Sequence, residues 1–524
     1  MAFPSIAGTM MQGARQVVIR ADASRSIGTG HVMRCLTLAR ILRGHNVLVR
    51  FVCREHEGHL CDLVEAAGFE VARLAKDSTD HEPYPGAPAH AAWLGTSWED
   101  DAWLTEAAIG VQGADWIIVD HYALDARWQR RLRGRTRRIM VIDDLADREH
   151  DCDVLLDQNF FADGRDRYCG IVPEHATLLL GPSYSLLAPD YEVLRRRTSP
   201  RQGAPEKILV SFGGADHQGL TRRAVEALLS LEGGPPSADV ILSSAAADFA
   251  AIREMVAGNE AIRLHDRVAS LAPFVLNADL AIGAGGATHW ERMCLGLPAL
   301  VITMAENQRQ IARQLADQNL IRWLGDAAHV SSANIRDAVE AVMREGLDPL
   351  WSSRCMALVD GLGAQRVAAV LGAGPAMDVS VRHAELSDEG LLLEWANDPL
   401  TRANGYNPAA IKPEDHARWF RARLRNPLGC RLFIVETIGS VPVGQVRFDD
   451  RGGEWEVSYS VAPEFRGRGV GRPMMEAALR ELGYEASTII GQVKPGNVAS
   501  RRIFEALGFM LRSSDPTRLV FERR

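Results

Sequence analysis

Residues 17–36 read VVIRADASRSIGTGHVMRCL, and this stretch decides how the first part of the chain folds. Residues 17–20 form an apolar run typical of a buried strand, and the apolar spacing over 31–43 predicts a helix. The Gly-x-Gly loop at 28–30 lies between them. A loop of this kind marks the carboxyl edge of a parallel sheet, where α/β proteins bind ligands.

The same alternation continues along the chain. Further strands are expected at 47–53, 116–120, 139–143, 207–212, 239–243, 278–283 and 299–303, and a further helix at 60–67. This βαβ pattern predicts parallel sheets covered by helices on both faces. The string RRRTSPRQGAP at 195–205 is typical of a linker. We therefore expect a disordered lead-in at 1–15 and two α/β halves, 16–200 and 201–372.

The pattern changes after residue 378. Strands expected at 432–436, 444–449 and 455–461 follow each other closely, and apolar and polar residues alternate along 455–461. A period of two gives a strand one apolar and one polar face. Residues 378–524 are therefore predicted to form a separate α+β domain rich in antiparallel strands.

Composition excludes several classes of protein. The 524 residues are 47% hydrophobic and 24% charged, with a net charge of −8, which is typical of a globular protein and not of one that coats nucleic acid. No apolar run is long enough to span a membrane. The eight cysteines are scattered and include no Cys-x-x-Cys pair. These features predict a cytoplasmic protein without nucleic-acid or membrane partners, and they leave its oligomeric state open.

One cluster has the residue types of a zinc site. Cys53, His56, His59 and Cys61 lie within nine residues, but their spacing does not match zinc fingers and no second ligand pair follows. A polar loop after a strand explains the same residues, and no metal is expected.

His31 is the candidate catalytic base of the first half. It follows the Gly-x-Gly loop directly, at the expected start of a helix. The helix dipole disfavours a charged imidazolium and keeps the ring able to accept a proton, whereas a nearby diphosphate would have the opposite effect. A capping or core histidine is the alternative.

Glycine-rich strand ends also occur in the second half. Gly213 and Gly214 follow one strand, and Gly285 and Gly286 follow another. Such loops at helix starts favour a nucleotide diphosphate as ligand. Glu291 is placed to accept hydrogen bonds from ribose hydroxyls, with a plain surface carboxylate as the alternative. No stretch has the P-loop lysine pattern, which disfavours ATP hydrolysis.

A third glycine-rich loop, VAPEFRGRGVG at 461–471, joins the strand 455–461 to a helix. Its backbone N–H groups and the helix start would form a pyrophosphate cradle, although a simple turn would also explain it. The helix at 497–509, NVASRRIFEALGF, provides a second motif. Together the two motifs resemble the GCN5-related N-acetyltransferase (GNAT) family.

The GNAT resemblance covers residues 378–524 and implies acetyl-CoA as co-substrate. The cofactor-binding residues that it implies are Val461, Arg466, Gly467, Arg468, Gly469, Val470, Gly471, Asn497 and Ser500. Phe504 stands where the family often has a tyrosine that protonates the departing thiolate, so that group is absent. We expect Glu456, on the polar face of the preceding strand, to relay the proton of the amine through water. A solvated strand carboxylate is the alternative.

Residues 16–370 carry a second resemblance. Their motifs are RADAS at 20–24, IGTGHVMR at 27–34, DHY at 120–122, DD at 143–144, GGAD at 213–216, Glu291, and NQ at 307–308. This set resembles the UDP-sugar hydrolases of pseudaminic acid biosynthesis, which are similar to MurG-type GT-B glycosyltransferases. The implied fold class is α/β, a GT-B-like pair of Rossmann-type domains followed by the α+β GNAT domain.

The hydrolase resemblance implies that the second half holds UDP, the first half holds the sugar, and His31 activates water. The substrate-binding residues that it implies are Arg20, Asp22, Ser24, Gly28, Gly30, Arg34, Asp120, His121, Tyr122, Gly213, Gly214, Gly285, Gly286, Glu291, Asn307 and Gln308. Acetylation of the 4-amino group precedes this hydrolysis in the pathway, so one chain would carry two consecutive steps on a UDP-linked amino sugar. A GT-B glycosyltransferase, a nucleotide-sugar sensor, and a GNAT domain acting on an unrelated amine are the alternatives.

Overall fold

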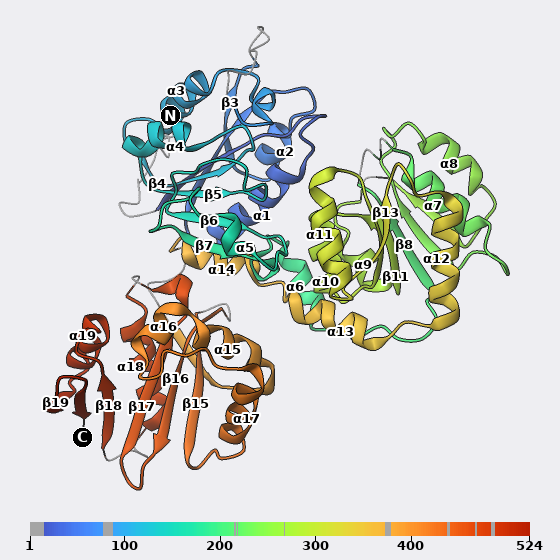
Figure 1. Ribbon diagram of the computed structural model, residues 1–524. Helices are drawn as coiled ribbons and strands as arrows, with labels where there is room; N and C mark the ends of the chain where they lie inside the picture. Colours follow the sequence, from blue (N-terminus) through green and yellow to red (C-terminus); the bar gives the residue numbers. More distant parts are fainter. Residues whose placement is uncertain are drawn as a thin grey trace, which may run out of the picture. The chain divides into compact units, whose positions relative to one another are not determined.

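The computed structural model describes residues 15–76, 87–213, 216, 218–266, 268–372, 379–437, 441–466, 469–483 and 488–523. The chain folds into two compact units, Met1–Ala368 and Ala369–Arg524, each described here by itself (Figure 1). Within the described ranges, no helix combines the length and apolar character needed to cross a membrane.

The first unit begins with a seven-stranded parallel sheet in the order β3-β2-β1-β4-β5-β6-β7. Its strands are β1 (Gln16–Ala21), β2 (Leu48–Arg54), β3 (Glu70–Leu74), β4 (Ala114–Asp120), β5 (Thr136–Ile142), β6 (Val154–Asp157) and β7 (Thr177–Leu180). The helices of this part are α1 (Gly30–Gly44), α2 (Cys61–Ala66), α3 (Trp98–Ile109), α4 (Ala126–Leu132) and α5 (Gly164–Arg167), with 3₁₀ turns η1 (Ala91–Leu94), η2 (Arg133–Arg135) and η3 (Pro182–Tyr184).

The second sheet of this unit is also parallel, in the order β10-β9-β8-β11-β12-β13. Its strands are β8 (Lys207–Ser211), β9 (Ser237–Ile241), β10 (Ile262–His265), β11 (Leu280–Ala284), β12 (Ala299–Thr303) and β13 (Arg322–Asp326). The accompanying helices are α6 (Pro189–Arg195), α7 (Leu220–Leu229), α8 (Phe249–Met255), α9 (Ala272–Asn277), α10 (Thr288–Cys294), α11 (Glu306–Asp317), α12 (Ser332–Glu345), α13 (Pro349–Leu358) and α14 (Gly363–Val370).

Burial on both faces explains why these strands are almost continuously apolar. On β8, Ile208 and Val210 belong to a core shared with α7 and α12, whereas Leu209 belongs to the opposite core, shared with α9, α10 and α11. Figure 1 shows these helices on the two sides of the sheet. Each strand therefore needs apolar side chains at successive positions, as parallel sheets between helix layers do.

The second unit holds a seven-stranded, mostly antiparallel sheet in the order β14-β15-β16-β17-β18-β20-β19. Its strands are β14 (Val379–His383), β15 (Cys430–Thr437), β16 (Pro442–Asp450), β17 (Trp455–Val461), β18 (Ile489–Val493), β19 (Met510–Ser514) and β20 (Leu519–Arg523). The helices are α15 (Glu389–Asn397), α16 (Pro399–Asn404), α17 (Pro413–Leu424), α18 (Gly471–Leu482) and α19 (Val498–Ala506), with 3₁₀ turns η4 (Leu386–Asp388) and η5 (Pro463–Phe465). β17 and β18 form its parallel pair.

The predicted architecture is confirmed: two parallel sheets, each with accompanying helices, precede a mostly antiparallel α+β sheet. Every strand expected from the sequence is present, with ends that differ by at most three residues. β3, β6, β7, β10 and β13 were not expected, because runs of only four or five residues are too short to give a periodic signal. The lead-in expected at 1–15 lies outside the described residues except for Arg15.

Candidate functional site

Ser24 holds the loop before α1 in one shape. Its hydroxyl oxygen accepts hydrogen bonds from the N–H groups of Ser26 at 3.2 Å and Ile27 at 2.9 Å. Its carbonyl oxygen accepts the N–H of Gly28 at 2.9 Å. Gly28 has a φ of +82°, a left-handed conformation in which a side chain would be strained. The turn ends at Gly30, where α1 begins, and brings His31 to the carboxyl edge of the first sheet.

Asp120, the last residue of β4, orients His31. His31 Nδ1 lies 2.5 Å from Asp120 Oδ1. Arg34 donates to both oxygens of the same carboxylate, from Nε at 2.7 Å and from Nη2 at 2.6 Å. Burial alone would raise the pKa of Asp120, but Arg34 and His31 together hold it far below its usual range. Because Asp120 is a carboxylate, Nδ1 of a neutral His31 carries the hydrogen and Nε2 is left to accept a proton.

Aromatic side chains lie beside His31. The ring of Tyr122 meets His31 edge to face, with centroids 4.6 Å apart, and Trp93 stacks on Tyr122 at 5.8 Å. His90 contacts Trp93 at 4.5 Å and Tyr122 at 5.4 Å. The Tyr122 hydroxyl donates to Asp144 Oδ1 at 2.5 Å, which fixes the ring. We call His90, Trp93 and Tyr122 the aromatic wall; it places an apolar surface next to the candidate base.

Arg20 and Asp22, predicted to contact the substrate, are fully buried. Arg20 donates to Asp22 at 2.6 Å and to Asp101 at 2.7 Å, and Arg54 also donates to Asp101 at 2.7 Å. Asp22 Oδ2 lies 3.2 Å from His121 Nε2. We call these five residues the buried ion network. Arg20 and Asp22 have no exposed surface, so they would act on substrate binding only by positioning His121. Their role in binding stays a prediction.

The end of β8 is fastened to α7. Gly213 has a φ of +91°, and Gly214 lies outside the described residues. Asp216 accepts the N–H groups of Leu220 at 3.0 Å and Thr221 at 2.6 Å, in the first turn of α7. The carboxylate thus satisfies N–H groups that would otherwise lack a partner in the helix.

Gly285 and Gly286 follow β11, and Gln308 packs against them from α11. A Cβ on Gly285 would lie 3.1 Å from the Gln308 Oε1 atom, so Gln308 would have to move by a few tenths of an ångström to admit a side chain there. Gln308 Oε1 in turn accepts the N–H of Met304 at 2.9 Å. Asn307 lies beside Gln308 in the first turn of α11. These four predicted residues therefore lie at the carboxyl ends of β11 and β12.

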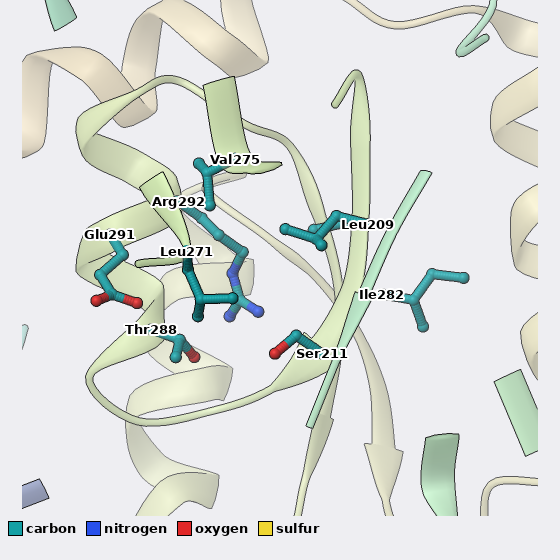
Figure 2. Close-up of a pocket in the computed structure, with 9 residues that line it drawn as sticks. Leu209, Ser211, Leu271, Val275, Ile282, Thr288, Glu291 and Arg292 are labelled. Atoms are coloured by element: carbon teal, nitrogen blue, oxygen red, sulfur yellow. The ribbon is translucent and has the colours of Figure 1, made fainter. Parts of the chain in front are cut away.

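Glu291 and Arg292 line a small cavity between α10, β8 and β11 (Figure 2). Figure 2 shows the Arg292 guanidinium pointing toward Ser211, whereas the Glu291 carboxylate points away from it. The cavity volume is about 10 Å³, room for one water molecule rather than a nucleotide. Burial raises the pKa of Glu291 to about 7. Contact with a ribose stays a prediction for this residue.

The sheet of the second unit opens between β17 and β18. The two strands pair only from Trp455 to Val457 on β17, opposite Ile489 to Gly491 on β18. Within the described residues, 458–461 continue β17 without a partner on that side. Unpaired backbone groups there are available to hydrogen-bond an extended ligand.

The predicted pyrophosphate cradle lies at the end of this opening, although Gly467 and Arg468 fall outside the described residues. Gly469 has a φ of +77° and, with Val470, leads into α18 at Gly471. A Cβ on Gly471 would lie 2.6 Å from Ile503 Cδ1, so this glycine lets α18 approach α19 closely.

Arg466 has a different set of partners from the one that the motif implies. Its guanidinium donates to Asp398 Oδ1 at 2.5 Å, to Thr401 Oγ1 at 2.7 Å and to the carbonyl oxygen of Val461 at 3.1 Å. Asp398 also caps α16 through the N–H of Thr401. Arg466 therefore ties the loop to α16, and direct contact with a pyrophosphate stays a prediction.

Glu456 lies in the part of β17 that pairs with β18, next to the opening, and α19 follows β18. The Glu456 carboxylate accepts hydrogen bonds from Arg451 at 2.8 Å and from Gln492 at 3.1 Å. Asn497 caps α19 through the N–H of Ser500 at 3.1 Å. The Ser500 hydroxyl accepts a hydrogen bond from Tyr459 at 3.0 Å. Ser500 thus connects β17 to α19 across the opening.

Comparison with known protein families identifies the class of the second unit. Residues 378–510 match the family model described as "Acetyltransferase (GNAT) domain". The antiparallel sheet, the opening between β17 and β18 and the glycine-rich turn before α18 all lie within or next to this range. The predicted C-terminal GNAT domain is confirmed.

Three related proteins align with parts of the chain. An uncharacterized protein of Methanocaldococcus jannaschii is 20% identical over 518 residues, 94% of this chain and 96% of that protein. The spore coat polysaccharide biosynthesis protein SpsG of Bacillus subtilis is 28% identical over 198 residues, 36% of this chain and 57% of that protein. The UDP-2,4-diacetamido-2,4,6-trideoxy-β-L-altropyranose hydrolase of Campylobacter jejuni is 25% identical over 207 residues, 39% of this chain and 63% of that protein. The chain thus spans about three fifths of the last two relatives, and the predicted resemblance to such a hydrolase is confirmed as partial homology.

The sequence pattern does not identify His90 and Trp93 of the aromatic wall, nor Tyr459. Trp93 lies in the 3₁₀ turn η1, and the sequence pattern of this segment does not indicate that it packs against Tyr122. Tyr459 alternates with Ser458 and Ser460 on β17, in step with the apolar residues of the strand, and therefore has the pattern of a core residue. Asp144 belongs to the DD motif at 143–144 but is not among the predicted site residues; its position just after β5, at the carboxyl edge of the sheet where Asp120 also lies, is the signal for it.

Proposed function

We propose that the chain catalyses two consecutive reactions on a UDP-linked amino sugar. The second unit would transfer the acetyl group of acetyl-CoA to the 4-amino group. The first unit would hydrolyse the product, UDP-2,4-diacetamido-2,4,6-trideoxy-β-L-altropyranose, to UDP and the free sugar. Homology to a hydrolase of that substrate and the GNAT match support the pair of assignments.

The His31–Asp120 pair carries the hydrolase proposal. His31 Nε2 takes a proton from water, and the water oxygen forms a bond to the anomeric carbon. The bond from that carbon to the phosphate oxygen breaks, and its electron pair leaves with UDP. Asp120 stabilises the imidazolium that forms, since the two groups are 2.5 Å apart. The aromatic wall and Arg34 would orient the sugar, and the glycine loops after β8 and β11 would hold the leaving diphosphate.

The opening between β17 and β18 supports the acetyl-transfer proposal. Acetyl-CoA is long and carries amide groups, which suit the unpaired backbone of residues 458–461. The start of α18 is positive and would hold the pyrophosphate. The amine nitrogen attacks the thioester carbonyl, the C–S bond breaks, and the electron pair goes to sulfur. Glu456 would pass the proton released by the amine to water.

One experiment tests both assignments. The purified chain is incubated with UDP-4-amino-4,6-dideoxy-N-acetyl-β-L-altrosamine, with and without acetyl-CoA, and the products are followed by NMR. We expect UDP and free diacetamido sugar only when acetyl-CoA is present. Acetylation without release of UDP would contradict the hydrolase and favour a glycosyltransferase, whose acceptor would then be sought. Release of UDP with no acetylation would indicate that the GNAT domain serves another amine.

The His31→Ala variant separates catalysis from binding. If His31 activates water, the variant loses UDP release from the diacetamido substrate but still binds UDP in calorimetry. A variant that releases UDP at the rate of the native chain would contradict this role. If the native chain itself binds UDP-sugar without converting it, a nucleotide-sugar sensor explains the first unit better.

A further inference from the structure

Transfer of an acetyl group from a thioester leaves a thiolate, which must gain a proton before it departs as a thiol. Phe504 cannot supply it, because a phenyl ring has no acidic hydrogen. Phe504 is also 2% exposed and packs against Phe509 and Phe521. Its ring lies over Gly491, where a Cβ would overlap it, so the side chain serves the core of the domain.

Tyr459 lies next to Phe504 and has the hydroxyl that Phe504 lacks. The two rings meet edge to face, with centroids 6.1 Å apart. Tyr459 follows Val457 by two residues, so it belongs to the part of β17 that has no partner strand toward β18. Its hydroxyl donates to Ser500 Oγ at 3.0 Å, across the opening in the sheet. A phenol is thus held beside the unpaired backbone of residues 458–461, where the proposed function puts acetyl-CoA.

We propose that Tyr459 is the general acid of acetyl transfer and that Ser500 positions it. This inference rests on the proposed acetyltransferase function and adds a residue to it. As the C–S bond breaks, the O–H of Tyr459 turns from Ser500 to the sulfur and gives it the proton. The products are the thiol and a Tyr459 phenolate, which receives a hydrogen bond from the Ser500 hydroxyl. Water then returns a proton to the phenolate.

The surroundings of Tyr459 keep it protonated until it is needed. Burial raises the pKa of Tyr459 above its usual value, and the hydrogen bond with Ser500 reduces this increase. The phenol therefore retains its hydrogen throughout the physiological range. A thiolate is a stronger base than bulk water and would draw that hydrogen once its sulfur lies within hydrogen-bond reach of the phenol oxygen, about 2.6–3.2 Å between heavy atoms.

The test is the Tyr459→Phe variant of the full chain, which removes one oxygen and keeps the ring. We expect kcat for acetyl transfer to fall about 100-fold, the low end of the effect of a general acid, while KM for acetyl-CoA stays within twofold. The solvent deuterium isotope effect on kcat should also change. Each variant is assayed with the UDP-amino sugar and with hydroxylamine. If acetyl is transferred to hydroxylamine but not to the UDP-amino sugar, the proposed acceptor is wrong. The role of Tyr459 is then tested by the hydroxylamine rates of the variants.

Ser500 gives a matched pair of variants. Ser500→Ala removes the hydroxyl that holds Tyr459 and should lower kcat in the same direction, whereas Ser500→Thr keeps a hydroxyl and should restore most of the rate. Release of UDP from the diacetamido sugar reports on the first unit of each variant. The proposal is overturned if Tyr459→Phe retains kcat within threefold of the native chain, or if kcat falls only together with a raised KM and a lowered melting temperature.

Discussion

The Asp120 carboxylate determines which nitrogen of His31 can act as a base. His31 and Arg34 both hydrogen-bond to this carboxylate. Replacement of the carboxylate by an amide changes these hydrogen bonds and keeps the shape of the side chain. In Asp120→Asn, the amide no longer stabilises an imidazolium, and Arg34 loses an ionic partner. We expect kcat for UDP release to fall about 100- to 10,000-fold, the range of general-base catalysis.

Steady-state kinetics with the diacetamido substrate measures this loss, and UDP binding reports that the fold is intact. Asp317→Asn is the matched control, because Asp317 is an exposed residue at the end of α11. It should keep kcat within twofold. An Asp120→Asn chain as fast as the control would show that His31 does not depend on this carboxylate.

Glu291 makes stability depend on pH. Its pKa is raised by burial from 4.5 to about 7, so the folded chain holds the proton more tightly than the unfolded chain does. Stability from this group is full below pH 4.5 and is lost as the pH rises through 7. The loss is at most about 3 kcal/mol, from 1.36 kcal/mol per pKa unit.

Urea unfolding at pH 5 and pH 8 tests this expectation. The free energy of unfolding of the native chain should fall between the two pH values by more than that of Glu291→Gln, which carries no titrating group. Glu254→Gln, at an exposed position of α8, is the control and should follow the native chain. Equal pH dependence in all three proteins would contradict the raised pKa.

At the scale of elements, one glycine lets α10 pack on the second sheet. A Cβ on Gly283 would lie 2.5 Å from Arg292 Nη1 and 2.5 Å from the carbonyl oxygen of Ser211. Gly283→Ala should therefore destabilise the chain by about 1–3 kcal/mol, the usual cost of overpacking. Gly44→Ala, at the end of α1 with open space around it, should leave the urea midpoint unchanged or slightly raised. Equal midpoints for the two variants would show that α10 can shift freely.

The sequence predicts elements better than it predicts sites. Long apolar runs and clean alternation predicted strands such as β1, β4, β8 and β17, because the spacing of apolar residues reflects burial directly. Glycine loops gave the carboxyl edge correctly, because backbone conformation there depends on local residue type. Arg466 shows the limit: its motif implies a phosphate contact, yet its partners Asp398 and Thr401 come from 65 to 68 residues earlier in the chain.

At the scale of the whole molecule, the two activities should be separable. The core of the second unit consists of its own residues, from Ala369 onward, and the first unit has its own cores around its two sheets. We therefore expect the chain to release UDP from the pre-acetylated sugar without acetyl-CoA. Addition of acetyl-CoA should change that rate by less than twofold in an NMR time course. A larger change would show that the GNAT domain regulates the hydrolase.

The buried ion network has a consequence for how the sequence can diverge. Asp101 accepts hydrogen bonds from Arg20, Arg54 and Trp128, all of them buried. Loss of one member leaves a charge in the core without its partner, at a cost of about 3–5 kcal/mol. Proteins that descend from this chain should therefore keep all of these residues or replace them together. The positions should change in a correlated way during evolution.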